Sequence, residues 1–162
     1  MFDPNLLQLA TNVLDKAREE KLRIATAESC TGGLVAALLT EIAGASDVFE
    51  RGFVVYSNTA KTEVLGVPAE LIAAHGAVSE PAARAMAEGA IKNSNAQLSA
   101  AVTGIAGPDG GTPDKPVGLV HIAAAREGRE MLHEQYLFGD IGRPEIRLAS
   151  AEAALRLLLR LL

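Results

Sequence analysis

Residues 22–33 read LRIATAESCTGG, and this stretch decides the fold class. Its first half, residues 22–27, is a short apolar run bounded by polar residues, which predicts a buried β-strand. Gly32 and Gly33 follow, and the apolar segment 34–42 after them predicts a helix that ends at Gly44. A buried strand that turns through small residues into a helix is typical of an α/β fold.

Helix and strand patterns alternate on both sides of this stretch. Helices are predicted over 3–20, 57–65, 67–76 and 79–91 and from 143 to the end of the chain, with strands over 52–56 and 97–103 and a hairpin of 117–125 and 130–138. Asp3, either Ser57 or Asn58, and Ser79 are the expected N-caps. The pattern predicts an α/β fold, a three-layer α/β/α sandwich on a mixed, mostly parallel sheet of about five strands.

Length and composition bound the function. The chain has 162 residues without a repeat or a long linker, so residues 1–162 are predicted to form a single domain. Hydrophobic residues make up 49% of the chain, which excludes disorder. The lone Cys30 excludes a disulfide scaffold, and three scattered histidines give no metal-ligand spacing. No metal and no cofactor are therefore expected.

Charge and hydropathy indicate which partners and which cellular location to expect. The net charge of −5 disfavours nucleic-acid binding. No apolar run is long enough to span a bilayer, and the N-terminus lacks the basic segment of a signal peptide. We expect a cytoplasmic protein with no membrane association. The leucine-rich stretch 155–162 is apolar on more than one side, which favours a homo-oligomer, although deeper burial within one chain explains it equally.

Three loops follow predicted parallel strands, namely residues 28–33, 56–61 and 103–111. In open α/β sheets the functional crevice lies beyond the carboxyl ends of the strands. We therefore expect these loops to meet at one edge of the sheet and to carry the chemistry.

The first loop offers a nucleophile and backbone donors. Ser29 provides a hydroxyl, and the N–H groups of residues 30–33 (Cys30, Thr31, Gly32 and Gly33) can hold a phosphate or an oxyanion. The plainer interpretation is an ordinary N-cap followed by glycines that permit close packing. At a helix N-terminus Cys30 would have a lowered pKa and is itself a possible nucleophile, or it is a small buried filler.

The second loop offers a base. A desolvated Lys61 loses its proton more easily and can deprotonate a serine, although lysines are more often exposed. Tyr56 can orient Lys61 or a substrate, or it is a half-buried strand residue. Asn58 can contact a substrate or cap the helix that carries Lys61.

The third loop and the last helix offer binding groups. Thr103, Gly104, Gly107 and Asp109 lie in a glycine-rich loop that can close over a substrate, although Pro108-Asp109-Gly110 is also an ordinary turn. Arg143 and Arg147 lie four residues apart, on one face of the last helix. They can clamp a phosphate, or they form a solvated face.

Five sequence blocks in this order give the chain a specific resemblance: TAESCTGG (26–33), FERGF (49–53), YSN (56–58) with Lys61, GAVSE (76–80), and GIAGPDGG (104–111) with KPVG (115–118). The series resembles the C-terminal domain family of the competence/damage-inducible protein CinA. Standalone members of that family are nicotinamide-nucleotide amidohydrolases, so the resemblance implies conversion of nicotinamide mononucleotide to nicotinate mononucleotide and ammonia. Longer relatives carry an additional N-terminal domain.

The resemblance implies roles for particular residues. The serine and lysine of the family map onto Ser29 as nucleophile and Lys61 as base. Tyr56 and Glu28 are then expected to tune or orient Lys61, and residues 103–111 to hold the nucleotide. Glu28 is also expected to contact the substrate. Rival interpretations are an amidase for another small amide, a binding module for pyridine nucleotides without turnover, and a partner-binding protein in DNA uptake or damage response.

Overall fold

The computed structural model describes residues 2–162. The helices are α1 (Pro4–Glu19), α2 (Leu34–Thr40), α3 (Asn58–Leu65), α4 (Ala69–His75), α5 (Glu80–Lys92) and α6 (Arg143–Arg160), with a short 3₁₀ turn, η1 (Ala45–Asp47). The strands are β1 (Ile24–Glu28), β2 (Phe49–Val54), β3 (Leu98–Gly104), β4 (Leu119–Arg126) and β5 (Leu132–Leu137).

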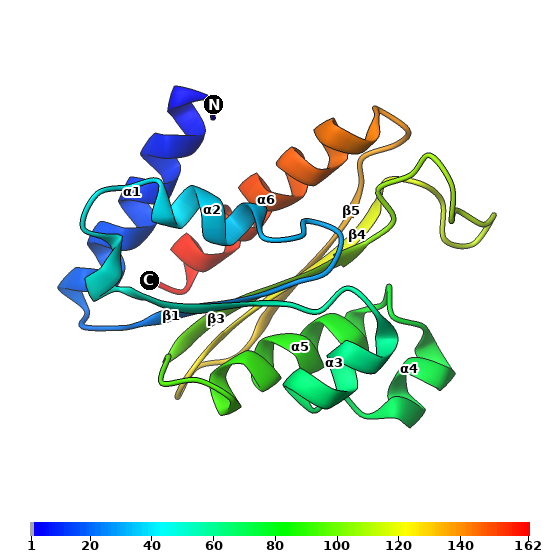
Figure 1. The fold of residues 1–162 in the computed structure, drawn as a ribbon, viewed down its shortest axis with the longest axis horizontal. Helices are drawn as coiled ribbons and strands as arrows, with labels where there is room; N and C mark the ends of the chain where they lie inside the picture. Colours follow the sequence, from blue (N-terminus) through cyan, green and yellow to red (C-terminus); the bar gives the residue numbers. More distant parts are fainter. Residues whose placement is uncertain (1) are drawn as a thin grey trace.

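The strands form one sheet in the order β2-β1-β3-β4-β5. Strand β1 pairs in parallel with β2 and β3, whereas β4 is antiparallel to both of its neighbours, β3 and β5. Among the described strands, β4 alone therefore runs against the common direction. Helices α1, α2 and α6 cover one face of the sheet and α3, α4 and α5 the other (Figure 1). The predicted α/β/α sandwich on a mixed, mostly parallel sheet is confirmed.

Side chains that alternate along the strands build two cores. In β3, Leu98, Ala100 and Val102 pack toward α1, α2 and α6, while Ala101 packs toward α5. The first of these cores contains Leu155, Leu157 and Leu158 of α6 and Leu161, which directly follows the helix. Burial within one chain thus accounts for the apolar surplus of the last helix.

The ends of several elements follow the sequence signals. The side chains of Asp3, Ser57 and Ser79 each accept a hydrogen bond from a first-turn amide, so the three predicted N-caps are confirmed. Within residues 2–162, no helix combines the length and the apolar character needed to cross a membrane.

Other boundaries were predicted wrongly. Strand β2 begins at Phe49 rather than at residue 52, because an edge strand tolerates the charged pair of Glu50 and Arg51 in its middle. Helix α2 stops at Thr40, and Gly44 starts η1 instead of ending the helix.

Candidate active site

The three predicted loops meet at one edge of the sheet, around a pocket of about 210 Å³. The predicted site residues that line it are Ser29, Cys30, Tyr56, Asn58, Lys61, Thr103, Gly104 and Arg143. Those that do not line it are Glu28, Thr31, Gly32, Gly33, Gly107, Asp109 and Arg147. Segment 77–78, between α4 and α5, supplies a wall that the sequence analysis did not assign to the site.

Lys61 and Ser29 form a buried pair at the centre of the pocket. Lys61 is 1% exposed, and its Nζ lies 2.9 Å from Ser29 Oγ. The same nitrogen lies 3.0 Å from the carbonyl oxygen of Val55 and 3.2 Å from that of Tyr56. The plainer alternative, an exposed lysine, is wrong, because α3 directs the side chain back under the end of β2.

The surroundings of Lys61 favour its neutral form. Burial lowers the pKa of its amine, and no carboxylate pairs with it in the part of the chain that the structure describes. A neutral amine has two N–H groups and one lone pair. When the N–H groups donate to the carbonyls of Val55 and Tyr56, the lone pair is left for the hydroxyl of Ser29. Tyr56 thus orients Lys61 through its backbone.

Cys30 does not have the reactive thiol that its position suggested. The residue is 6% exposed, and burial raises the pKa of the thiol to about 11. The expectation of a lowered pKa is wrong, because desolvation outweighs the helix N-terminus. Because the thiolate rather than the thiol is the nucleophile, the geometry favours Ser29 over Cys30.

Glu28 plays a different part from the predicted one. Its carboxylate accepts hydrogen bonds from the backbone N–H groups of Gly33, Val35 and Ala36, at 3.1, 3.0 and 2.9 Å. It therefore caps α2, and the expectation that it orients Lys61 or contacts a substrate is wrong. The N-terminus of α2 already holds an anion supplied by the chain.

Because Glu28 accepts hydrogen bonds from amides at the start of α2, fewer of the predicted N–H groups are free to bind an oxyanion. The N–H of Gly33 is occupied by Glu28, and the N–H of Gly32 donates to the carbonyl of Ser29 at 3.0 Å. The N–H groups of Cys30 and Thr31 have no acceptor within residues 2–162. Of the four predicted donors, the N–H of Cys30 is left for a ligand, because Thr31 is fully buried and does not line the pocket.

Side chains hold the pocket wall at residues 75–78 in place. Thr103 donates its hydroxyl hydrogen to the carbonyl of Ala77 at 2.8 Å. Lys115 Nζ donates to the carbonyls of His75 and Val78, at 2.6 and 2.8 Å. The predicted substrate role of Thr103 gives way to a structural one, because its hydroxyl is already used. Lys115 belongs to the KPVG motif, and the sequence predicted no role for it.

The two arginines of α6 do not form a clamp. Arg143 lies at the pocket rim and donates to the carbonyl of Gly107 at 2.7 Å and to the hydroxyl of Tyr56 at 3.1 Å. Arg147 donates to backbone carbonyls of the first loop and does not line the pocket. Asp109 is exposed on the far part of its loop. The predicted phosphate clamp is therefore wrong for Arg147, and Arg143 is left as the cation at the rim.

Comparison with known proteins agrees with this architecture. Residues 6–162 match the family described as the CinA C-terminal domain. The chain belongs to this family. It is 57% identical over 137 residues to a CinA-like protein of Anaeromyxobacter dehalogenans, covering 84% of this chain and 33% of that protein. A CinA-like protein of Syntrophus aciditrophicus is 54% identical over 144 residues, covering 89% and 34%.

Solved structures of CinA proteins share the whole fold. The competence/damage inducible protein CihA of Agrobacterium tumefaciens matches with a TM-score of 0.98 and 49% identity, over 99% of this chain and 98% of that one. A CinA superfamily protein of Escherichia coli matches with a TM-score of 0.92 and 31% identity, over 100% and 94%. The chain spans about a third of the length of the curated CinA-like relatives.

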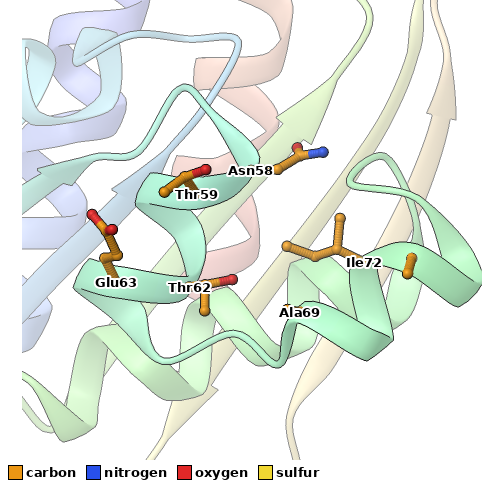
Figure 2. Close-up of a pocket in the computed structure, with 7 residues that line it drawn as sticks. Asn58, Thr59, Thr62, Glu63, Ala69 and Ile72 are labelled. Carbon is orange, nitrogen blue, oxygen red and sulfur yellow. The ribbon is translucent and has the colours of Figure 1, made fainter.

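A larger pocket of this CinA domain lies beside the first, between α3 and α4 (Figure 2). Its volume is about 480 Å³, and its lining includes Thr59, Thr62, Glu63 and Ile72. It holds neither a buried base nor a nucleophile beside one. Asn58 belongs to both pockets. In the described residues, no three His, Cys, Asp or Glu side chains gather as a metal site would require.

Proposed function

We propose that this CinA domain hydrolyses the carboxamide of nicotinamide mononucleotide, releasing nicotinate mononucleotide and ammonia. One observation carries the proposal, the 2.9 Å contact between the buried amine of Lys61 and the hydroxyl of Ser29. An amine whose pKa is lowered by burial can accept the proton of a neighbouring serine and so activate it as a nucleophile. Membership of the CinA family supports the choice of substrate.

The proposed reaction begins when Ser29 Oγ attacks the carboxamide carbon and its proton passes to Lys61 Nζ. The negative charge that develops on the carboxamide oxygen is held by the N–H group of Cys30. The C–N bond then breaks as Lys61 returns the proton to the leaving nitrogen, so that ammonia departs. Water, deprotonated by Lys61, hydrolyses the acyl-Ser29 ester to release the carboxylate and restore the hydroxyl.

The lining of the pocket suits a nucleotide. It contains two basic side chains, Lys61 and Arg143, and no carboxylate. Arg143 at the rim is placed to bind the phosphate. Tyr56 is 62% exposed beside it, and its ring can stack on the pyridinium of the substrate. Tyr56 then acts twice, with its backbone on Lys61 and its ring on the substrate.

The test is ammonia release from nicotinamide mononucleotide by the wild type and by the Ser29→Ala and Lys61→Met variants. Ser46→Ala and Lys92→Met are matched controls, because both residues are exposed and outside the pocket. We expect turnover by the wild type and both controls, and its loss in the two site variants. Full activity of Ser29→Ala would refute the mechanism.

The same assay separates the proposal from its rivals. Release of ammonia from other small amides but not from the nucleotide would indicate a different amidase. A folded wild-type protein that binds the nucleotide in calorimetry without turnover would be a binding module.

A further inference from the structure

The guanidinium of Arg147 lies against the backbone of the loop that carries Ser29. Its Nε donates to the carbonyl of Cys30 at 3.1 Å and its Nη2 to the carbonyl of Thr31 at 2.9 Å. The approach is close, since a Cβ on Gly32 would lie 3.3 Å from Nη2. Within residues 2–162, Arg147 forms no ion pair with a carboxylate. Its contacts with the loop are therefore its polar role in the fold.

These contacts fix the direction of the free backbone donors. In a trans peptide unit the C=O and the following N–H point in opposite directions. Because the carbonyl of Cys30 points at Arg147, the N–H of Thr31 points away from it. The carbonyl of Thr31 also points at Arg147, which shares it with the N–H of Leu34 at 3.2 Å. The N–H of Gly32, in the same peptide unit, therefore turns back to the carbonyl of Ser29, at 3.0 Å. That bond in turn directs the N–H of Cys30 away from Gly32.

We infer that Arg147 is the positioning residue of the oxyanion site, because it holds the peptide planes of the turn that directs the N–H group of Cys30. This inference rests on the proposed function in one respect, that Ser29 is the nucleophile. The residue after a nucleophilic serine supplies an oxyanion donor in α/β-hydrolases, and Cys30 has that place here. Arg147 acts through the loop and touches no reacting atom.

The positive charge of Arg147 also favours a negative charge at the oxyanion site. The guanidinium lowers the pKa of the Cys30 thiol, against the larger effect of burial, so its field reaches this part of the loop. A negative charge that forms at the oxyanion site is favoured by the same field. Arg147→Lys keeps the charge but loses the planar fork that spans two carbonyls, whereas Arg147→Gln loses the charge as well.

The experiment measures how fast Ser29 reacts with a fluorophosphonate. The serine oxygen bonds to phosphorus, fluoride leaves, the proton passes to Lys61, and the phosphoryl oxygen takes the place of the oxyanion. The rate constant is read by intact-protein mass spectrometry for the wild type, Arg147→Gln, Arg147→Lys and the control Arg156→Gln, which changes an exposed arginine of the same helix. Ser29→Ala identifies the labelled residue. The kcat and KM for nicotinamide mononucleotide are measured in parallel, and circular dichroism confirms folding.

We expect Arg147→Gln to lower the labelling rate constant and kcat together, by about 10- to 100-fold, because the N–H of Cys30 is misdirected rather than removed. We expect KM to change by less than about threefold, Arg147→Lys to lie between Arg147→Gln and the wild type, and Arg156→Gln to match the wild type. Arg147→Lys decides the question alone should Arg147→Gln fail to fold.

Wild-type labelling and kcat in the folded variants would overturn the inference. A raised KM with unchanged kcat and labelling would also overturn it, since Arg147 would then bind substrate. So would a wild-type protein whose Ser29 is not labelled at all. If the nucleotide is not hydrolysed but labelling falls as expected, the proposed function fails and the positioning role stands.

Discussion

Replacing Lys61 by methionine separates the pH dependence of stability from the packing of the side chain. Lys61 is 1% exposed, and burial lowers the pKa of its amine below the ordinary lysine value. In the unfolded chain the amine titrates near pH 10.4. Between the folded and the unfolded pKa, the unfolded chain binds a proton that the folded protein does not.

The sign and size of the effect follow from this difference. Stability rises with pH wherever the unfolded state binds more protons. The contribution of Lys61 is therefore fully present above the unfolded pKa and is lost as the pH falls through the folded pKa. One proton corresponds to a slope of about 1.4 kcal/mol per pH unit. Lys61→Met also leaves the carbonyls of Val55 and Tyr56 without their donor, at a cost of about 1–3 kcal/mol each that does not vary with pH.

The assay is urea unfolding of the wild type and Lys61→Met from pH 7 to pH 11, with Lys92→Met as the exposed control. We subtract the free energy of unfolding of Lys61→Met from that of the wild type. This difference should rise by up to about 1.4 kcal/mol per pH unit between the folded and the unfolded pKa, and stay constant above the unfolded pKa. A difference that stays constant over the whole range would refute the reasoning, because Lys61 would then titrate alike in both states.

Three further changes test the supports of the site. Glu28→Gln should lower the free energy of unfolding by about 1–3 kcal/mol, since it weakens the charged cap of α2, while the pH dependence of activity stays that of the wild type; a shifted profile would mean that Glu28 acts on the base. Gly89→Ala should destabilise by about 1–3 kcal/mol in the same urea assay, because its Cβ would lie 2.2 Å from the carbonyl oxygen of Leu65, and a gain in stability would contradict the packing. Lys115→Ala should raise KM for the nucleotide by about 3- to 30-fold through release of the pocket wall, and unchanged steady-state kinetics would show that the wall holds without it.

Local sequence signals predicted most of the fold. The N-caps Asp3, Ser57 and Ser79 start their helices where expected, because capping needs only a side chain and the amides of the next turn. The apolar run of residues 22–27 likewise predicted β1 as a buried strand, because a strand that is covered on both faces is apolar along its length. The predicted bounds of strand β2 were wrong because its central residues are polar and its pairing with β1 involves residues distant in sequence.

The candidate site was predictable in its position but not in its internal assignments. The meeting of the three loops follows from strand direction, which the alternation of elements predicts. The burial of Lys61 depends on the path of α3 beneath β2, and no local pattern carries that. The contact of Arg147 with Cys30 joins residues 117 positions apart. The turn that lets the amides of α2 donate to Glu28 depends on φ angles of +58° at Gly32 and +102° at Gly33.

The reversed direction of β4 gives the protein one segment that is free to diversify. Because β4 is antiparallel to β3, the connection over residues 105–118 leaves the sheet and returns to it at the same edge (Figure 1). Lys115 ties its returning limb to the wall formed by residues 75–78. Insertions or exchanges within its exposed residues 108–114 would change the outer surface of the protein while the register of every strand stayed unchanged.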